Sequence, residues 1–379
     1  MRSGPGIVGT VTPRQRTTAV VAAVALAAAG ATVGVTLAQS DRAATPVAGA
    51  PPVGKPLEGA PPLVLELGVR DDAEAKALRA ASQLLDAGKR IDAARQFSLY
   101  HSLEAQVAQI VAQWSPDAGL RGLQALALEH PDSGLVQYHL ALALVWVGRI
   151  VEAEKVWRAT MQKDPDSPYA VRAADLLHPD LPRGLPSFVP SFPDPPGLGG
   201  LTPAAQLAEL RRRAEQGGVH DHIAYGVALQ RLQRRVSAER QFALAAAAAP
   251  DDAEALTAAA FGRFDKDAPT RAFSQLGPLA QRFPKSATLR YHLGIMLLWI
   301  GDVARSRQEL RLAVQDGPEG AAVVEAAQAV LAELAKQKSR SRTAVAGPCT
   351  FRPRPVQQCR SPAFGRCHDC AQGDQDGRR

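Results

Sequence analysis

Between residues 73 and 336 the chain alternates between amphipathic stretches of helix-forming residues and short turns that contain proline. Alanine dominates the apolar residues, and aromatic residues make up only 5% of the chain, which favours helices packed through small side chains. Several prolines recur at an interval of 34 residues: Pro131 to Pro165, Pro250 to Pro284 and Pro284 to Pro318. Because proline ends one helix and can occupy the turn before the next, this interval fits two helices and two short turns. The pattern predicts an all-α fold of repeated helix pairs.

The amphipathic region is also duplicated. Residues 129–148 and 282–301 are identical at eight of twenty positions, and residues 90–97 resemble residues 235–242. The identical positions of the longer match are Pro131/Pro284, Ser133/Ser286, Tyr138/Tyr291, His139/His292, Leu140/Leu293, Leu144/Leu297, Trp146/Trp299 and Gly148/Gly301. The duplication predicts two lobes of about three helix pairs each.

A proline-rich segment separates the two copies. Residues 178–200 contain seven prolines, a density that no helix tolerates, so we expect an extended connector there. The alternative is a rigid connector, in which Phe188 and Phe192 dock on a lobe. Thr202 and Pro203 form a good N-cap and N1 pair for the helix that follows. The predicted boundaries are 73–177 for lobe 1, 178–201 for the connector and 202–336 for lobe 2.

The repeat resembles the tetratricopeptide repeat (TPR), because residue types match as well as the period. These matches are Leu140, Ala141, Leu144, Gly148, Ala153, Trp157 and Pro165 in one unit, Leu293, Gly294, Leu297, Gly301, Ala313 and Pro318 in another, and Gly226, Ala238, Phe242, Ala245 and Pro250 in a third, where Gln233 replaces the turn glycine. The resemblance implies an α-α superhelical solenoid. Small side chains such as Gly226 and Ala238 let helices approach closely, while Phe97, Trp157 and Phe242 fill the space between helix pairs.

A long uncharged segment lies near the start of the chain. Residues 17–40 contain no charge and are long enough for one transmembrane helix. Arg14 and Arg16 precede it, so the positive-inside rule places residues 1–16 in the cytoplasm and the rest outside. The alternative is a signal peptide cleaved after the small-x-small sequence Thr36-Leu37-Ala38. Both interpretations export the helical lobes, and we favour the uncleaved anchor.

Flexible segments flank the helical lobes in our interpretation. Residues 41–72 are rich in Pro, Gly and Ala and are predicted to form a spacer. Residues 337–379 are rich in Arg, Pro and Gly and are predicted to form a disordered basic tail. The net charge of +7 invites a nucleic-acid function, but residues 1–16 carry +3 and residues 335–379 carry +7. The remainder is therefore mildly acidic, which disfavours nucleic-acid binding by the helical lobes.

No catalytic set is recognisable between residues 41 and 334, where cysteine, P-loop and nucleophile-elbow motifs are absent, so we expect no enzyme and no cofactor. His220-Asp221-His222 is the one histidine cluster of this region, and a helix-capping Asp explains it better than a metal does. All four cysteines lie in the tail. Weak metal candidates are Cys359, Cys367 and Cys370, whose spacing matches no zinc pattern, and disulfides are an alternative.

The TPR resemblance implies a concave groove that binds a partner segment through fixed positions of each first helix. These positions are Leu135, Tyr138, Leu142, Val145 and Trp146 in lobe 1, and Thr288, Tyr291, Ile295, Leu298 and Trp299 in lobe 2. The alternative is that each lobe closes on itself and buries them as core. His139 and His292 neighbour this face, and we expect both to be exposed without a role.

The sequence thus favours a single-pass scaffold of the cell membrane, with most of the chain outside the cytoplasm. Its expected partners are proteins, components of an envelope assembly, and its abundant Ala and Arg suggest a bacterial origin. Two alternatives stay open: a secreted TPR protein after signal cleavage, and a redox or zinc-binding factor that acts through the cysteine tail. The partner and the oligomeric state cannot be deduced from the sequence.

Overall fold

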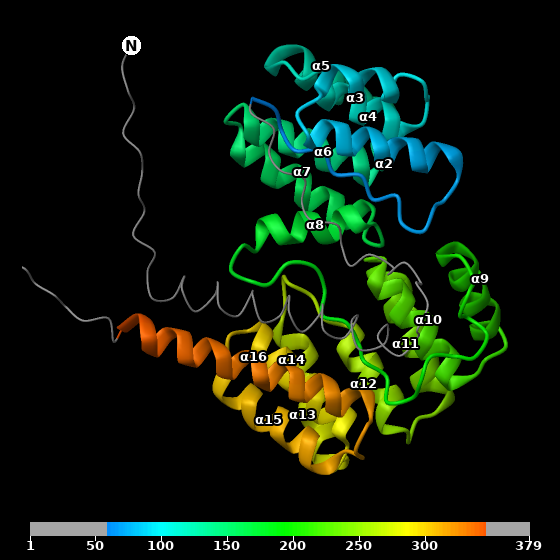
Figure 1. Ribbon diagram of the computed structural model, residues 1–379, viewed down its shortest axis with the longest axis vertical. Helices are drawn as coiled ribbons and strands as arrows, with labels where there is room; N and C mark the ends of the chain where they lie inside the picture. Colours follow the sequence, from blue (N-terminus) through cyan, green and yellow to red (C-terminus); the bar gives the residue numbers. More distant parts are fainter. Residues whose placement is uncertain (1–58, 346–379) are drawn as a thin grey trace, which may run out of the picture. The chain divides into compact units, whose positions relative to one another are not determined.

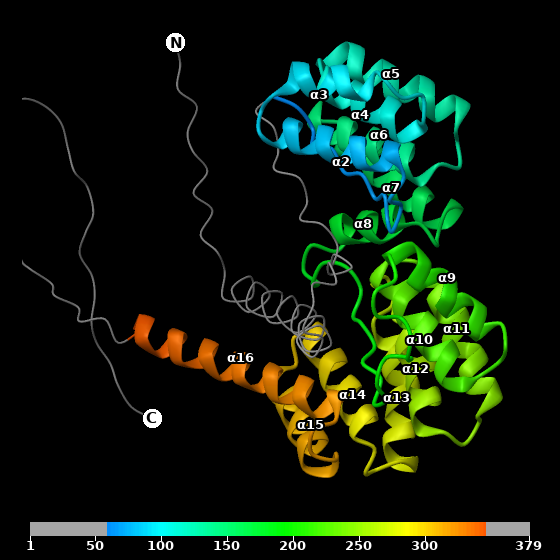
Figure 2. The same cartoon turned by 45° about the vertical axis from the view of Figure 1, so that its right-hand side comes forward.

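The computed structural model describes residues 59–345, with side chains described as far as residue 336. The predicted transmembrane segment, the N-terminus predicted to be cytoplasmic and the four cysteines lie outside the described residues. Among the residues that are described, no helix is both long and apolar enough to span a membrane. The described part is all-helical, as the sequence predicts, and contains fifteen helices (Figures 1 and 2).

Lobe 1 is built from seven helices, and successive helices pack against each other. They are α2 (Ala73–Asp86), α3 (Arg90–Phe97), α4 (Leu103–Ala112), α5 (Pro116–Glu129), α6 (Gly134–Trp146), α7 (Ile150–Lys163) and α8 (Pro168–Leu177). The last helix of this lobe is α8, which Ser167 caps by accepting a hydrogen bond from the backbone of Tyr169.

Lobe 2 contains the remaining eight helices. They are α9 (Pro203–Ala214), α10 (Val219–Arg231), α11 (Arg235–Ala248), α12 (Ala253–Gly262), α13 (Thr270–Arg282), α14 (Ala287–Trp299), α15 (Val303–Asp316) and α16 (Ala322–Val345). Thr202 caps α9 as expected, since its hydroxyl accepts a hydrogen bond from the backbone of Ala205. The duplicated serines act alike as well: Ser133 caps α6 and Ser286 caps α14.

The turn within a helix pair requires a left-handed backbone. Gly88, Gly148 and Gly301 occupy it with φ of 77°, 82° and 85°. Gln233 stands at the equivalent turn between α10 and α11 and is the one non-glycine residue of the described chain with positive φ, at 59°. Left-handed backbone favours glycine because a Cβ crowds the following carbonyl oxygen. The TPR resemblance placed the turns at Gly148, Gly301 and Gln233 correctly, the one that lacks glycine included.

The predicted packing roles are confirmed. Phe97 and Phe242 are fully buried, and Trp157 is 6% exposed. At Gly226, a Cβ would lie only 2.5 Å from the ring of Phe242, so α10 and α11 can approach this closely only with glycine there.

The predicted spacer, however, ends earlier than residue 72. Ala60, Val64 and Leu67 are at most 6% exposed and belong to the cores of lobe 1. The described connector is extended, as expected, but Phe188 and Val189 are buried in the core of lobe 2. Both lobes therefore incorporate an extended segment that precedes their helices in the sequence (blue before α2 and green between α8 and α9 in Figure 1).

Candidate functional site

The ten predicted groove residues lie on α6 and α14 and differ in exposure. In lobe 2 all five are buried, from Leu298 at 0% exposed to Thr288 at 6%. In lobe 1, Leu135 and Tyr138 are buried and Leu142 is half-buried. Val145 and Trp146 remain exposed, at 38% and 40%. Of the ten predicted positions, the most accessible to a partner are therefore Val145 and Trp146, at the C-terminal end of α6.

Trp299, the counterpart of Trp146, is covered from within lobe 2. Its ring lies edge-on to Phe264 at 5.3 Å between centroids, and the ammonium group of Lys266 lies 5.6 Å from its centroid. Lys266 also forms an ion pair with Asp175 and donates to the carbonyl oxygen of Pro182. The duplicated tryptophans therefore have different surroundings despite their equal positions in the sequence.

An extended segment of the chain lies against the predicted groove face in each lobe. We call residues 60–67 the lobe-1 segment and residues 185–192 the lobe-2 segment. Val64 shares a buried cluster with Tyr138. Phe188 stacks on the ring of His292, with 4.1 Å between centroids and 11° between planes. The helices that carry the predicted groove positions, α6 and α14, are thus already in contact with segments of the same chain.

The duplicated histidines hold both segments in the same way. His139 accepts a hydrogen bond at Nε2 from the backbone N–H of Val64, at 3.1 Å, and His292 accepts one from Val189, at 2.9 Å. The other ring nitrogen, Nδ1, lies 2.8 Å from the carbonyl oxygen of Leu135 in His139, and 2.6 Å from that of Thr288 in His292. Because a carbonyl oxygen can only accept, Nδ1 carries the proton and the ring is neutral.

The expectation that these histidines are exposed spectators was wrong. They are 1% and 0% exposed. Burial lowers the pKa of His139 to about 4 and that of His292 to about 3, against the opposing effect of the carbonyl each ring bonds. The positive charge of Arg172 lowers the pKa of His139 further. Each ring is therefore a fixed hydrogen-bond acceptor at neutral pH.

Lobe 1 adds two contacts from α8 to its segment. The hydroxyl of Tyr169 accepts a hydrogen bond from the backbone N–H of Glu66 at 2.9 Å and lies 3.4 Å from the carbonyl oxygen of Val64, to which it donates. Arg172 forms an ion pair with the carboxylate of Glu66, and both side chains are about 90% buried. Burial raises the pKa of Tyr169 far above its usual value, so this phenol stays protonated.

Lobe 2 holds its segment with different polar groups. Gln230 accepts from the backbone N–H of Phe188 at 2.9 Å, and Glu254 accepts from both the backbone and the hydroxyl of Ser191. Phe192 stacks on His220 at 4.3 Å between centroids. The two lobes therefore hold their segments through the same histidine contact but through different additional side chains.

The histidine cluster of α10 forms no metal site in the structure. His220 stacks on Phe192, and Nδ1 of His222 lies 2.8 Å from the side-chain oxygen of Gln241. No group of three or more His, Cys, Asp and Glu side chains that could hold a metal occurs among residues 59–336. The cysteine candidates lie outside this range.

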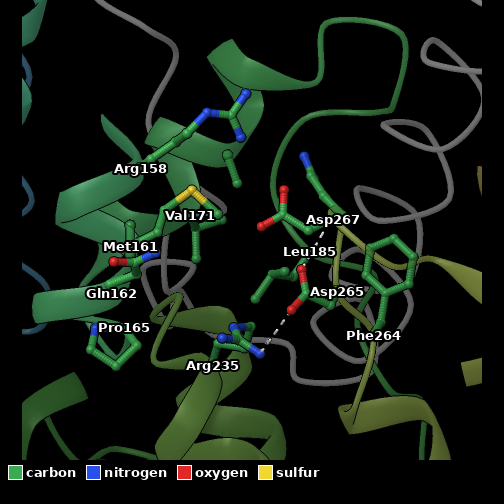
Figure 3. A pocket seen from close by; sticks show the side chains of 13 residues that line it. Arg158, Met161, Gln162, Pro165, Val171, Leu185, Arg235, Phe264, Asp265 and Asp267 are labelled. Atoms are coloured by element: carbon green, nitrogen blue, oxygen red, sulfur yellow. Dashed lines mark hydrogen bonds and ion pairs between the residues drawn. The ribbon is translucent and has the colours of Figure 1, made fainter. Parts of the chain in front are cut away.

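A pocket lined by α7, α8, α11 and the loop after α12 is a second concave feature (Figure 3). Its charged side chains are of both signs: Arg158, Arg235 and Lys266 face Asp265 and Asp267. Arg235 pairs with Asp265 at 4.0 Å, and Asp267 lies 2.6 Å from Nε2 of His178. Because these charges largely compensate each other, the pocket shows no preference for a charged ligand.

The lobe-1 segment was not found from the sequence, since an extended segment carries no helical periodicity. For the lobe-2 segment, the alternative in which Phe188 and Phe192 dock on a lobe describes the structure. One signal was available. An apolar residue followed by valine occurs in both segments, as Leu63-Val64 and Phe188-Val189. Each of these pairs precedes the duplicated Tyr-His pair of its own lobe.

Helix pairs that repeat along the chain, with a left-handed residue in the turn of each matched pair, define a helical-repeat protein of TPR-like units. No model of a known protein family matches the sequence, and no curated protein matches it either.

The comparison with solved structures finds, among others, three proteins, two of which are described as TPR proteins. One, from Parabacteroides merdae, is 12% identical with a TM-score of 0.29, over 68% of this chain and 98% of that one. Yeast Tom70 is 12% identical with a TM-score of 0.27, over 72% of this chain and 56% of that one. The TPR domain of P58(IPK) is 14% identical with a TM-score of 0.25, over 71% and 81%. Similarity at this level carries no information about function.

Proposed function

We propose that this protein is a helical-repeat scaffold that binds extended segments of protein partners, anchored in the cell membrane by residues 17–40 with its lobes outside the cytoplasm. One observation supports it above all: each lobe holds an extended segment against the face of its duplicated Tyr-His helix, through the same backbone hydrogen bond. A surface that orders an extended backbone without covalent chemistry is suited to recognising other segments. The envelope location rests on the sequence alone.

The exposed part of the predicted groove surface offers the first test. Val145, Trp146, Ile150 and Val151 surround the turn between α6 and α7 and are 38% to 68% exposed. Tryptophan at such a position supplies a large contact area at low entropic cost. We therefore expect Trp146 to contact a bound partner.

A photo-crosslinking amino acid placed at position 146 of the full chain in its native cells should yield a defined adduct with a membrane or exported protein. Leu128, on α5 and 84% exposed, provides the matched control position. Trp146→Ala should reduce recovery of the same partner at least tenfold, with an unchanged unfolding transition. Equal crosslinking at both positions, or recovery unchanged by Trp146→Ala, would count against the scaffold function.

A further inference from the structure

The lobe-1 segment is bound mainly through groups that any extended peptide could present. His139 accepts from Val64, and the hydroxyl of Tyr169 bonds both Val64 and Glu66. These three hydrogen bonds use backbone atoms of the segment. The groove therefore recognises an extended backbone over three consecutive residues, from residue 64 to residue 66, and supplies its polar partners from α6 and α8.

Two side chains of the segment make the groove selective. Val64 is 5% exposed and packs in the apolar cluster of Tyr138 and Tyr169, where a charged side chain would lose its hydration. Glu66 meets Arg172, which is 8% exposed. A buried guanidinium requires a negative partner, because leaving it uncompensated costs more than the pair itself contributes. The groove thus fits a branched aliphatic residue followed two positions later by glutamate.

The two segments differ in how the chain holds them. The lobe-2 segment is joined to a described helix at both ends, to α8 and to α9. Within the described residues, the lobe-1 segment is joined to a helix only at its C-terminal end, where Gly68, with φ of 53°, leads to α2. Within residues 59–336, displacing the lobe-1 segment therefore disturbs the junction with one helix only, α2.

We propose that the lobe-1 groove is a binding site for an extended partner segment with a branched aliphatic residue and a glutamate two positions later, and that residues 60–67 are its tethered competitor. This inference rests on the proposed scaffold function. A tethered segment acts at a high effective concentration, so a partner binds only when its own affinity or local concentration overcomes it. Under this proposal, weakly binding peptides do not displace residues 60–67, whereas a partner segment with the aliphatic residue and the glutamate does.

The test uses the full chain and a fluorescein-labelled synthetic peptide with the sequence of residues 59–68, followed by fluorescence anisotropy. Val64→Asp in the chain weakens the tethered segment, so this variant should bind the peptide at least tenfold more tightly than the unaltered chain. Circular dichroism verifies that the variant is folded. If it is not, Glu66→Gln replaces it, since that change keeps the volume of the side chain.

Charge reversal then decides whether the peptide occupies the proposed site. Adding Arg172→Glu to the Val64→Asp chain should abolish binding of the native peptide and restore binding of a peptide that carries Glu66→Arg. The control is Arg158→Glu, a reversal at an exposed position on α7, which should leave binding unchanged.

Three results would overturn the inference: no peptide binding by a folded variant with a weakened segment, binding that ignores the charges at positions 66 and 172, or dimerisation of the variants in analytical ultracentrifugation, which would make the groove a self-association site. None of these results affects crosslinking at Trp146. Conversely, the absence of a crosslinked partner would not alter peptide binding, so the two proposals can fail separately.

Discussion

His139 and His292 each use both ring nitrogens, and only a neutral ring permits this. Nδ1–H donates to a carbonyl oxygen of the same helix, so Nε2 is left to accept the backbone N–H of Val64 or Val189. A second proton would place two N–H donors opposite each other. A buried polar contact of each segment thus depends on one protonation state of the ring.

The pH dependence of stability follows from this. The pKa of each histidine is lowered on folding, to about 4 and about 3, so the unfolded chain takes up protons first as the pH falls. The contribution of these rings is complete above the unfolded pKa of about 6.5 and is lost below it, at about 1.4 kcal/mol per pH unit for each ring. Between pH 6.5 and 5 each lobe should lose about 2 kcal/mol.

Urea unfolding at pH 7.5, 6.5 and 5 measures this loss. His139→Gln and His292→Gln remove the titrating rings, so both variants should be less stable at pH 7.5 but show a smaller decrease towards pH 5. Ordinary carboxyl groups titrate mainly below this range and affect all the chains alike. The decrease in stability of the unaltered chain should also exceed that of a variant carrying both substitutions, and a decrease no larger than that would contradict the assignment.

The helices show which parts of the structure the sequence determines locally. Turns, caps and helix pairs follow from residues close together in the sequence, and the turn at Gly148 and the cap at Thr202 were predicted correctly. The burial of Val64 and Phe188 depends on helices about 75 to 100 residues further along the chain. Those contacts have no local pattern, so residues 60–67 were indistinguishable from a spacer.

Gln233 provides a quantitative test at the level of a single turn. It adopts the left-handed backbone of its glycine counterparts, and its side-chain oxygen is buried without a hydrogen-bond partner. Gln233→Gly should stabilise lobe 2 by about 0.5–1 kcal/mol, because relief of the left-handed strain exceeds the added flexibility of the unfolded chain. Gly148→Gln, the reverse change in lobe 1, should destabilise by about 1 kcal/mol.

Chemical denaturation of these two variants against the unaltered chain measures both effects. The loss of the weak bond from Gln233 to the carbonyl oxygen of Gln230, at 3.3 Å, opposes the gain only slightly. Destabilisation by Gln233→Gly would mean that this side chain contributes more to the turn than its backbone strain costs.

On the scale of the whole molecule, the charge distribution and the uncharged residues 17–40 both favour a membrane anchor near the start of the chain. The described lobes belong to the mildly acidic part of the chain, while the basic residues concentrate at its two ends. Arg14 and Arg16 directly precede the uncharged residues 17–40, an order typical of an anchor whose N-terminus stays in the cytoplasm. The lobe-1 segment begins only about twenty residues after this run.

Fractionation of cells that express the full chain tests the anchor. The chain should sediment with membranes and resist extraction by high salt and by alkaline carbonate, because apolar burial of residues 17–40 is insensitive to both. A variant without residues 1–40 keeps every helix of the two lobes and should stay in the supernatant. Protease added outside intact spheroplasts should degrade the lobes of the full chain. A purified protein whose N-terminal sequence begins near Gln39 would show cleavage instead, and the scaffold would then act as a released protein.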